Sequence, residues 1–441
     1  MQAEQIGGLV KITGLKDIKS AVMRYALPNP KYTQAVAQKR NVYGLDKYVY
    51  FAQRQDDSVL IPVLCYKRYK PLDFPEVDFP KHGARLRDYQ LRAVDEWVVR
   101  DHGILQACAG SGKTIIGSEI IRRKRVRSVI VVPTKDIMHQ WCDAAERFCN
   151  LQPHRLGGGY AEATEDSDLI VATYQSLVRK PERLRNCGLI IVDECHRTPC
   201  ISIDKILGAC PAKFRYGCTA TPWRADGLHK ALTWLLGGVK VVVERDEIRQ
   251  HILDPEIEVV DSGFSFATKK DANLFQNLVA ECEPRNKLIA RLINDKVKNG
   301  YKVLTLAQRI DQLYDLAERN PKHTYAVIDG STKKADRIAF LKAARDGELD
   351  CLYATYSLAG EGLDVPALSC LVYAAPNGNP TRTEQSCGRI ARPHDGKNAP
   401  VVVDLRDGGP MPSRLWRSRC NTYKALGYNM SETVESHSLL D

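Results

Sequence analysis

The amino-acid sequence has 441 residues, of which 44% are hydrophobic and 27% are charged. This composition is ordinary for globular proteins and excludes collagen-like, low-complexity and wholly disordered chains, while the length predicts about two to four domains. No apolar run approaches the roughly 18 residues that span a membrane, and the first residues lack the pattern of a signal peptide. We therefore expect a cytoplasmic protein with no membrane partner.

The charge distribution suggests what kind of partner the chain has. The formal net charge is +11, and the excess of Lys and Arg lies within residues 1–240. A basic excess favours a polyanion such as nucleic acid, although a solvated basic surface has the same composition. None of the 14 cysteines belongs to a Cys-x-x-Cys pair, so free thiols in a reducing compartment are favoured over disulfides or a zinc site.

The first 80 residues have the pattern of a small accessory domain. Runs of β-forming residues at 47–51 and 59–64, then prolines through 71–80, predict strands followed by a linker. Two stretches, 47–50 and 66–70, interleave Tyr with Lys or Arg. They fit either nucleic-acid contacts, through stacking and phosphate binding, or Lys protection of an edge strand.

Apolar runs alternate with helical patterns in the rest of the chain. We expect a helix at 136–148 among strands at 128–132, 168–171 and 189–192. From about residue 250 we expect a helix at 286–298 and strands at 302–306, 325–328, 351–354, 370–374 and 401–405. Continuous apolar runs predict parallel strands that are buried on both faces. The predicted fold class is therefore α/β, with two tandem parallel-sheet domains at 81–245 and 246–441 behind the accessory domain at 1–80.

One segment joins an apolar run to a helical pattern through a loop of small residues. The loop, residues 107–114, reads Ala-Cys-Ala-Gly-Ser-Gly-Lys-Thr, and this context is typical of a phosphate-binding loop. Backbone N–H groups and a helix N-terminus would face the phosphates. Lys113 is predicted to reach the β- and γ-phosphates of ATP and Thr114 to ligate Mg²⁺. The strict pattern has Gly where this chain has Ala107.

A second segment supplies carboxylates. The apolar run 189–192 leads directly into Asp193-Glu194-Cys195-His196. Because an acidic residue at the carboxyl end of a parallel strand is suited to hold Mg²⁺, Asp193 is predicted to hold the metal. Glu194 is predicted to orient or deprotonate the attacking water. His196 is expected to act as a hydrogen-bonding coupler.

A series of motifs resembles that of the superfamily 2 helicases and double-stranded nucleic acid translocases over residues 84–405. The matching segments are 86–90, 109–114, 132–134 with 140–141, 172–176, 193–196, 219–222, 354–355 with 360–366, and 385–392. The tail at 223–227 is similar to that of XPB-like and phage branch-migration (UvsW-type) helicases, although Ala225 departs from the XPB pattern. The resemblance implies two RecA-like domains that use ATP and Mg²⁺ to act on nucleic acid.

The resemblance also implies roles for individual residues. Gln385, Arg389 and Arg392 of the last motif would act in catalysis, the arginines by stabilising charge on the transferred phosphoryl group from the opposite domain. Such arginines are worth roughly 10³–10⁵ in rate. The nucleotide contacts implied are Arg87, Gln90 on the adenine edge, Ala109, Gly110, Ser111, Gly112, Lys113, Thr114, Gly362 and Asp364. The phosphates of the nucleic acid would be bound by Thr134, Thr173, Gln175 and Thr355.

Two further basic clusters are candidates for nucleic-acid contacts. The run 122–127 closes the helix after the phosphate-binding loop, where a solvated helix end is the alternative interpretation. The other cluster comprises Arg414, Arg417, Arg419 and Lys424.

We therefore expect an ATP-dependent helicase or translocase that acts as a monomer and remodels branched DNA, such as forks and recombination junctions. Two alternatives stay open. One is a DExH-type RNA helicase, because the motor motifs do not distinguish the sugar. The other is a non-motor nucleic-acid-binding switch with weak ATPase activity, although the presence of Lys113, Asp193 and Glu194 argues against it.

Overall fold

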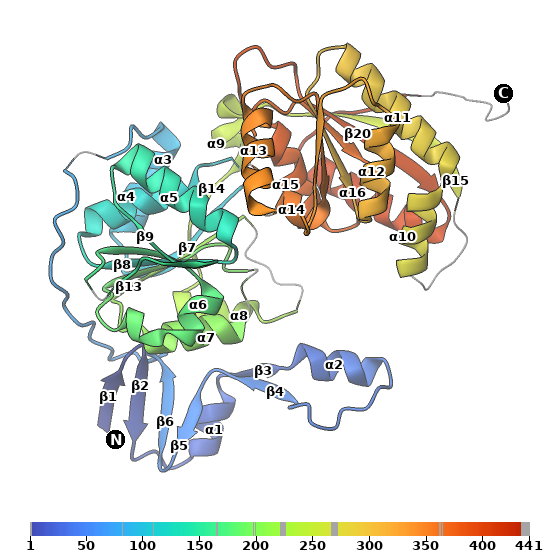
Figure 1. Cartoon of the computed structure of the whole chain (residues 1–441). Coiled ribbons are helices and arrows are strands. Elements are labelled where there is room, and N and C mark those ends of the chain that lie inside the picture. The colour runs from blue at the N-terminus through green and yellow to red at the C-terminus, as the bar shows by residue number, and fades with distance from the viewer. Residues whose placement is uncertain are drawn as a thin grey trace. The chain divides into compact units, whose positions relative to one another are not determined.

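The computed structural model describes residues 2–433 apart from 82, 109, 165, 197, 199, 221–225, 266–271, 361, 362 and 364, and leaves out the side chains of 334, 359, 360 and 433. The chain divides into two compact units, Met1–Glu244 and Arg245–Asp441. Each unit is built around a parallel sheet (Figure 1). No helix in the described part of the chain combines the length and the apolar character that a bilayer span needs.

The first unit contains an eight-stranded sheet with the order β10-β9-β11-β8-β12-β13-β7-β14. Every neighbouring pair is parallel except β10 with β9. Runs such as β8 and β12 are buried along their whole length because helices cover both faces. The strands are β7 (His102–Ala107), β8 (Ser128–Val132), β9 (His154–Gly157), β10 (Tyr160–Ala161), β11 (Leu169–Thr173), β12 (Leu189–Val192), β13 (Phe214–Thr219) and β14 (Val239–Val243).

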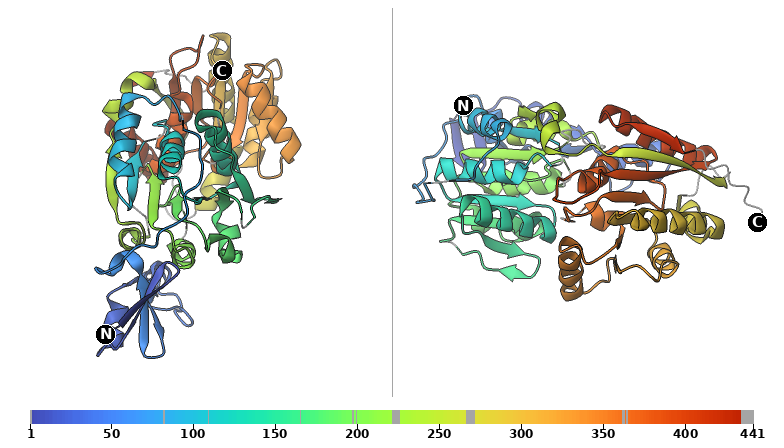
Figure 2. Two further views of the ribbon diagram at one scale, coloured as in Figure 1. Left: turned by 90° about the vertical axis from the view of Figure 1, so that its left-hand side faces the viewer. Right: turned by 90° about the horizontal axis from the view of Figure 1, so that it is seen from above.

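Helices cover the two faces of this sheet in two groups. On one face α3, α4 and α5 contact one another in sequence, and on the other face α6, α7 and α8 do so (Figures 1 and 2). Their bounds are α3 (Asp88–Val98), α4 (Lys113–Lys124), α5 (Lys135–Cys149), α6 (Tyr174–Arg179), α7 (Cys200–Ala209) and α8 (His229–Leu236).

The N-terminal segment adds two small antiparallel sheets to the first unit. Strands β1 (Gln2–Ile6), β2 (Leu9–Thr13), β6 (Ser58–Pro62) and β5 (Gln53–Gln55) form one sheet in that order, beside α1 (Ile18–Met23) and the 3-10 helix η1 (Val63–Cys65). Strands β3 (Ala26–Pro28) and β4 (Tyr48–Tyr50) form the other, with α2 (Pro30–Ala37) between them. Residues 26–50 project as an arm (Figure 1).

Direct contacts fix the N-terminal segment to the helices of the first unit. The Trp234 ring of α8 lies edge-on to Tyr25 at 5.5 Å and to Phe51 at 5.7 Å between ring centroids. The backbone N–H of Gly8 donates to the carbonyl of Gly208 in α7 at 2.8 Å. Removing residues 1–80 would therefore expose the apolar surface around Trp234, which carries part of the core of this unit.

The basic run 122–127 holds the linker that follows the N-terminal segment. Arg125 forms ion pairs with Glu76 and with Asp78, the latter at 2.9 Å. Arg122 donates to the carbonyl of Lys81 at 2.7 Å, and Arg123 pairs with Asp95 at 2.6 Å. The structure thus gives Arg122, Arg123 and Arg125 intramolecular partners, and nucleic-acid contact by this run stays a prediction.

The second unit contains a seven-stranded sheet with the order β17-β18-β16-β19-β20-β15-β21, parallel throughout. Its strands are β15 (Glu256–Ser265), β16 (Val303–Ala307), β17 (Tyr325–Ile328), β18 (Cys351–Thr355), β19 (Cys370–Tyr373), β20 (Val401–Gly408) and β21 (Met430–Thr433). Its helices are α9 (Arg245–Ile248), α10 (Ala272–Glu281), α11 (Glu283–Lys298), α12 (Ile310–Glu318), α13 (Lys334–Arg345), α14 (Tyr356–Gly360), α15 (Pro380–Ile390) and α16 (Pro410–Ala425).

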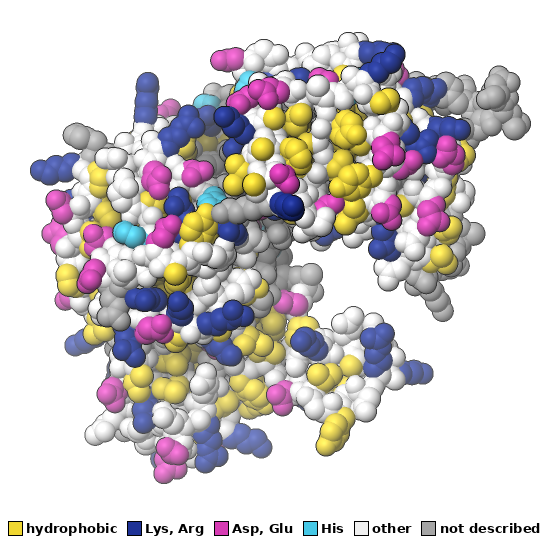
Figure 3. Space-filling view, viewed as in Figure 1, with side chains coloured by type: hydrophobic (Ala, Val, Ile, Leu, Met, Phe, Trp, Pro, Cys, Tyr) yellow, Lys and Arg dark blue, Asp and Glu magenta, His cyan; other side chains and the backbone are white. Residues whose placement is uncertain are grey.

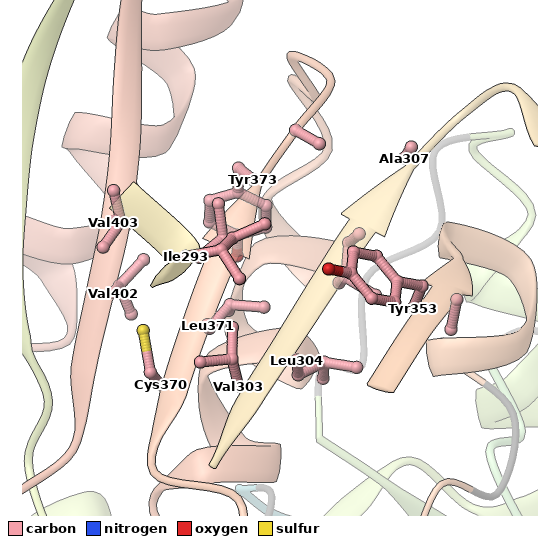
Figure 4. Close-up of a cluster of buried hydrophobic side chains, with 14 of the residues drawn as sticks. Ile293, Val303, Leu304, Ala307, Tyr353, Cys370, Leu371, Tyr373, Val402 and Val403 are labelled. Carbon is pink, nitrogen blue, oxygen red and sulfur yellow. The ribbon is translucent and has the colours of Figure 1, made fainter. Parts of the chain in front are cut away.

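Apolar side chains from the central strands of this sheet meet the covering helices in one core. Figure 4 shows Val303 and Leu304 of β16 beside Leu371 of β19, with Ile293 of α11 against them. Two buried ion pairs lie in the same unit, Arg285–Asp407 at 2.9 Å and Arg419–Asp404 at 2.7 Å. Because buried charges are tolerated only when paired and hydrogen-bonded, each pair constrains how its helix meets the sheet.

Of the 14 free cysteines, all but Cys65, Cys108 and Cys282 are buried. Most therefore serve as small apolar side chains in the two cores.

The predicted α/β fold class with two tandem parallel sheets is confirmed. The run 189–192 coincides with β12, and the helix expected at 136–148 forms as α5 with one more residue at each end. The sequence interpretation missed β14, β15, β21 and the helices of the N-terminal segment. Strands β14 and β21 lie at the sheet edges, and β14 and β15 carry several exposed or half-buried residues, so their hydrophobic signal is diluted.

Candidate nucleotide-binding site

Strand register gathers the predicted site residues of the first unit at one edge of its sheet. Gln106 of β7 pairs with Thr219 at the end of β13, and Gly217 pairs with Val192 at the end of β12. The phosphate-binding loop, the Asp193–His196 segment and Thr219 therefore follow neighbouring strands. Ligands of open α/β sheets bind at this carboxyl edge.

The loop after β7 has the conformation that its glycines require. Gly112 has φ +79° and directly precedes α4, and a side chain there would collide with that of Gln90. Ala107, the departure from the strict pattern, is the last residue of β7, where extended backbone suits any residue. The Lys113 ammonium donates to the carbonyls of Ala107 at 2.9 Å and Cys108 at 3.5 Å. The cation thus lies over the loop where phosphates would compete for it.

Helix α3 brings the predicted adenine-reading residues to the same loop. Gln90 is buried, and its Nε2 donates to the Ser111 carbonyl at 3.2 Å while its Oε1 accepts from the Arg87 backbone N–H at 3.1 Å. Tyr89 donates to the same Ser111 carbonyl at 3.1 Å. Both ends of the Gln90 amide therefore have partners within the protein. A base would have to displace one of them, and adenine contact by Gln90 or Arg87 stays a prediction.

Asp193 is held by two hydrogen-bond donors at the end of β12. The Trp141 indole N–H donates to its Oδ2 at 2.7 Å, and the Glu194 backbone N–H donates to its Oδ1 at 2.9 Å. Burial, with the Glu194 carboxylate beside it, raises the pKa of Asp193. Glu194 has φ +43°, a left-handed conformation that a non-glycine residue rarely adopts. The two carboxylates are thus packed together in a dry, constrained turn.

His196 connects this turn to the next strand. Its Nδ1 lies 2.6 Å from the Thr219 hydroxyl and 3.4 Å from Glu194 Oε2. Thr219 ends β13 and begins the motif at 219–222, of which residues 221 and 222 lie outside the described part of the chain. The contact between His196 and Thr219 therefore gives the predicted coupling one partner, at the start of the motif at 219–222.

The residues at this edge have the chemistry that Mg²⁺ prefers. A hydroxyl from Thr114 and the Asp193 carboxylate are hard oxygen donors. Glu194 Oε2 is buried and makes no hydrogen bond within the described part of the chain, although His196 Nδ1 lies 3.4 Å from it. A cation and its ordered water would satisfy such an orphaned acceptor. The donor set therefore fits Mg²⁺, which Thr114 and Asp193 would hold, as the sequence predicts.

The candidate phosphate contacts for nucleic acid differ in exposure. Gln175 is exposed and Thr134 is half-buried, where it accepts from the Ile137 N–H as the cap of α5. Thr173 is buried, with its hydroxyl 2.9 Å from that of Ser176. Thr355 of the second unit is likewise buried, 3.1 Å from the Ser357 hydroxyl. The two buried threonines would need to exchange these partners before they could bind a phosphate.

A triple-glycine turn, Gly157–Gly159, lies among these residues and was missed from the sequence. All three glycines have positive φ, and a side chain on Gly157 would collide with the hydroxyls of Thr173 and Ser176. Lys135 donates to the Gly158 carbonyl. Three consecutive glycines between two strands were the available signal, because such a run permits close approach of a backbone.

The second unit places arginines at the carboxyl edge of its own sheet. Arg389, on α15 after β19, donates to the Leu363 carbonyl at 2.8 Å. Burial, followed by the charge of Arg345, lowers the pKa of Arg392. Gln385 is buried, and no donor in the described structure reaches its Oε1. Gly362 and Asp364, together with Ala109 of the first unit, lie outside the described residues.

Lys397 links three backbone segments at this edge by hydrogen bonds. It was not singled out from the sequence. Its ammonium donates to the carbonyls of Pro366 at 3.0 Å, Ile390 at 2.7 Å and Arg392 at 2.8 Å. Ile390 ends α15, so the cation caps the helix that carries Arg389. Burial and the Arg392 guanidinium lower the pKa of Lys397 to about 8.

Two sequence candidates for nucleic-acid contact have structural roles. Arg419 of the C-terminal cluster is buried against Asp404, whereas Arg414, Arg417 and Lys424 are exposed. Within residues 66–70, the half-buried Tyr66 and Tyr69 pack against the core of the N-terminal segment, and nucleic-acid contact by this stretch stays a prediction.

Comparisons with known proteins follow the same division of the chain. Residues 83–224 match the family described as "Type III restriction enzyme, res subunit", and residues 284–394 match "Helicase conserved C-terminal domain". The chain is 27% identical over 391 residues to DNA 3'-5' translocase XPB2 of Sulfurisphaera tokodaii, covering 79% of this chain and 87% of that protein. It is 26% identical to DNA 3'-5' helicase XPB of Kineococcus radiotolerans, covering 72% of this chain but only 59% of that protein.

Two further similarities extend this picture. Putative ATP-dependent RNA helicase L396 of Acanthamoeba polyphaga mimivirus is 24% identical, covering 96% of this chain and 84% of that protein. A fragment of a putative HsdR subunit of a type I restriction enzyme from Vibrio vulnificus has the same fold, with a TM-score of 0.61, 19% identity, and coverage of 80% of this chain and 69% of that one.

Two RecA-like sheets, a phosphate-binding loop and a DExH-type segment define an ATP-hydrolysing nucleic-acid motor. The chain belongs to the superfamily 2 helicases, and its relatives include XPB-like and phage helicases.

Proposed function

We propose that this chain is an ATP-dependent DNA helicase or translocase that remodels branched DNA, such as forks and recombination junctions. The observation that carries the proposal is the meeting of Lys113, Asp193 and Glu194 at one sheet edge, within a chain whose relatives include a DNA 3'-5' translocase. We further propose that it acts as a monomer with three domains, at 1–80, 81–245 and 246–441.

In the first unit, the proposed roles follow from position and charge. Gly110, Ser111 and Gly112 present backbone N–H groups to the phosphates, and Lys113 leaves the loop carbonyls for the β- and γ-phosphates. When bound, Mg²⁺ neutralises charge on these phosphates. Glu194, whose buried Oε2 makes no hydrogen bond within the described part of the chain and lies 3.4 Å from His196 Nδ1, orients the attacking water and accepts its proton.

In the second unit, Arg389 and Arg392 are proposed to stabilise charge on the γ-phosphoryl group, with Gln385 assisting. This role requires the second unit to close on the nucleotide during the cycle, so hydrolysis and domain movement are coupled. Thr134, Thr173, Gln175, Thr355 and the Gly157–Gly159 turn are proposed to follow the phosphate backbone without reading sequence.

An RNA helicase is the second candidate. The mimivirus relative named a putative ATP-dependent RNA helicase covers 96% of this chain. The motor edge offers no group in its described part that would distinguish ribose from deoxyribose.

The test is the Mg²⁺-dependent ATPase rate with no nucleic acid, with single-stranded DNA, duplex DNA, a four-way DNA junction, and matched RNA. We expect the junction to stimulate turnover most. Stimulation by RNA alone would replace the proposal with the RNA helicase. Absence of turnover under all conditions would leave the nucleic-acid-binding switch.

A further inference from the structure

The arm, residues 26–50, is a thin projection that buries few of its own side chains. Helix α2 has one buried residue, Ala35. At the far turn, Tyr43 is 94% exposed, and Tyr50 near the base is 44% exposed. An isolated two-stranded ribbon with one short helix gains little stability from its own packing. Exposed aromatic rings on such an element have the character of a binding surface, because tyrosine supplies a large contact area at low entropic cost.

The cations of the arm lie exposed, and Lys47 lies over the neighbouring Tyr48 ring, 5.6 Å from its centroid. Lys31, Lys39, Arg40 and Lys47 are all exposed, and none forms an ion pair with the described residues. The arm contains a single carboxylate, that of Asp46. Figure 3 shows Lys and Arg side chains around the arm, with hydrophobic or aromatic side chains between them.

The basic run 122–127 provides an internal contrast. Its arginines are directed onto Glu76, Asp78, Asp95 and Glu119. The cations of the run 122–127 therefore stabilise the fold through ion pairs with nearby carboxylates. The arm has almost no carboxylates, so its charge is left for a partner that brings negative charge.

The base of the arm is fixed, which makes its tip a defined position. Leu27 at the start of the arm is buried in the core that contains Trp234 of α8, and Val49 packs against the same core. The Asn29 side chain donates to the Asp46 carbonyl at 2.8 Å, and its backbone N–H donates to the Lys47 carbonyl at 3.0 Å, which together close the ribbon. The exposed rings and cations are therefore presented by an anchored support.

We propose that the arm binds an unpaired nucleic-acid strand, with Tyr43 and Tyr50 stacking on bases and Lys39, Arg40 and Lys47 contacting phosphates. The faces of bases are accessible in a single strand and covered within a duplex, so ring stacking selects the unpaired strand. The partner class rests on the proposed function, whereas the role of the arm does not depend on ATP hydrolysis. The arm thus forms a second strand-binding surface, built from elements other than those that carry the motor motifs.

The stacking role is tested by equilibrium binding of a dye-labelled oligothymidylate to the full chain without ATP. Tyr43→Ala should weaken binding by at least about fivefold, since stacking on one ring is worth roughly that much or more. Tyr43→Phe keeps the ring and should bind like the wild type. Binding of a blunt duplex should change little in either variant. An equal loss for blunt duplex, or an unchanged oligothymidylate affinity in Tyr43→Ala, would overturn the proposal.

The phosphate role is tested by salt titration. Arg40→Gln with Lys47→Gln should lower the slope of log affinity against log salt by about 0.7 for each phosphate that the variant no longer neutralises. The matched control is Lys16→Gln with Lys19→Gln, which removes two exposed cations of the same segment outside the arm. The control should keep the wild-type slope. Equal slopes in both double variants would contradict the role of the arm, whereas loss of ATPase stimulation with intact binding would contradict only the motor function.

Discussion

The carboxyl edges of the two parallel sheets are alike in architecture and opposite in chemistry. The first edge combines one lysine over a phosphate-binding loop with two packed carboxylates, Asp193 and Glu194. The second edge presents Arg389, Arg392 and Lys397. Repetition of one fold has therefore produced two different surfaces.

The difference shows what each edge could do alone. The first has groups suited to a nucleotide phosphate and a metal, with Lys113 as the cation proposed to reach the γ-phosphate. The second has cations suited to a developing negative charge, with no carboxylate among the described groups assigned to it. The comparison predicts that substitutions at the two edges have distinguishable kinetic signatures.

The largest expected effect comes from Lys113→Ala in the first edge. Loss of the ammonium should abolish measurable turnover and weaken ATP binding, because the cation contacts the phosphates in the ground state as well as in the transition state. Steady-state ATPase assays and nucleotide titration would show both losses. Nucleic-acid affinity should persist with its salt dependence. Turnover at the wild-type rate would disprove the assignment of the loop.

Arg389→Ala in the second edge should act on the rate alone. We expect kcat to fall by about 10³-fold with ATP affinity little changed, since the arginine is assigned to the transition state. Arg291→Ala, which removes an exposed arginine of α11, is the matched control and should leave kcat unchanged. A matching loss of ATP binding in the Arg389 variant would erase the distinction between the edges.

Trp141→Phe tests how the first edge holds its metal. The substitution keeps most of the buried ring but removes the N–H that donates to Asp193. Loss of such a partner typically costs 10- to 100-fold in metal affinity, so the Mg²⁺ concentration for half-maximal ATPase should rise by about 10-fold. Trp97→Phe is the control, because this buried indole donates to the Gly103 carbonyl and lies off the edge. An equal shift in both variants would show a general packing effect.

Lys397→Met tests whether the second edge depends on its helix cap. Three carbonyls would lose their donor, and we expect kcat to fall by roughly 10-fold with KM unchanged, equivalent to about 1.4 kcal/mol of lost positioning. Wild-type kcat should also fall as the pH rises above about 8, because Lys397 then loses its proton. Arg392 and, through it, Arg345 are the charged groups that face this site. The Met variant should lack that step in its pH profile, and a retained step would rule out Lys397 as its source.

The loop, the carboxylates and the sheet edges were predictable from the sequence because they rest on short-range patterns. An apolar run followed by Gly-Ser-Gly-Lys-Thr, or by Asp-Glu, fixes the end of a strand and the side chains that follow it. Register then brings these ends together without further information.

The partners of each side chain could not be predicted in the same way. The bond from Trp141 to Asp193 joins residues 52 positions apart, and the contacts of Lys397 with Pro366 span 31 positions. Nothing local in the sequence distinguishes the paired cations at 122–127 from the exposed cations of the arm. That distinction depends on where distant carboxylates lie in the fold.

The burial of the cysteines has a practical consequence for chemical labelling. Burial raises the pKa of the Cys65 thiol to about 12. Cys108 and Cys282 are the other two thiols that are incompletely buried. Cys108 lies in the phosphate-binding loop and Cys282 precedes α11 in the other unit. Alkylation of Cys108 should slow when nucleotide fills the loop, while Cys282 serves as an internal reference. The rate of Cys108 alkylation in the wild-type chain therefore reports whether nucleotide occupies the loop, and no engineered label is needed.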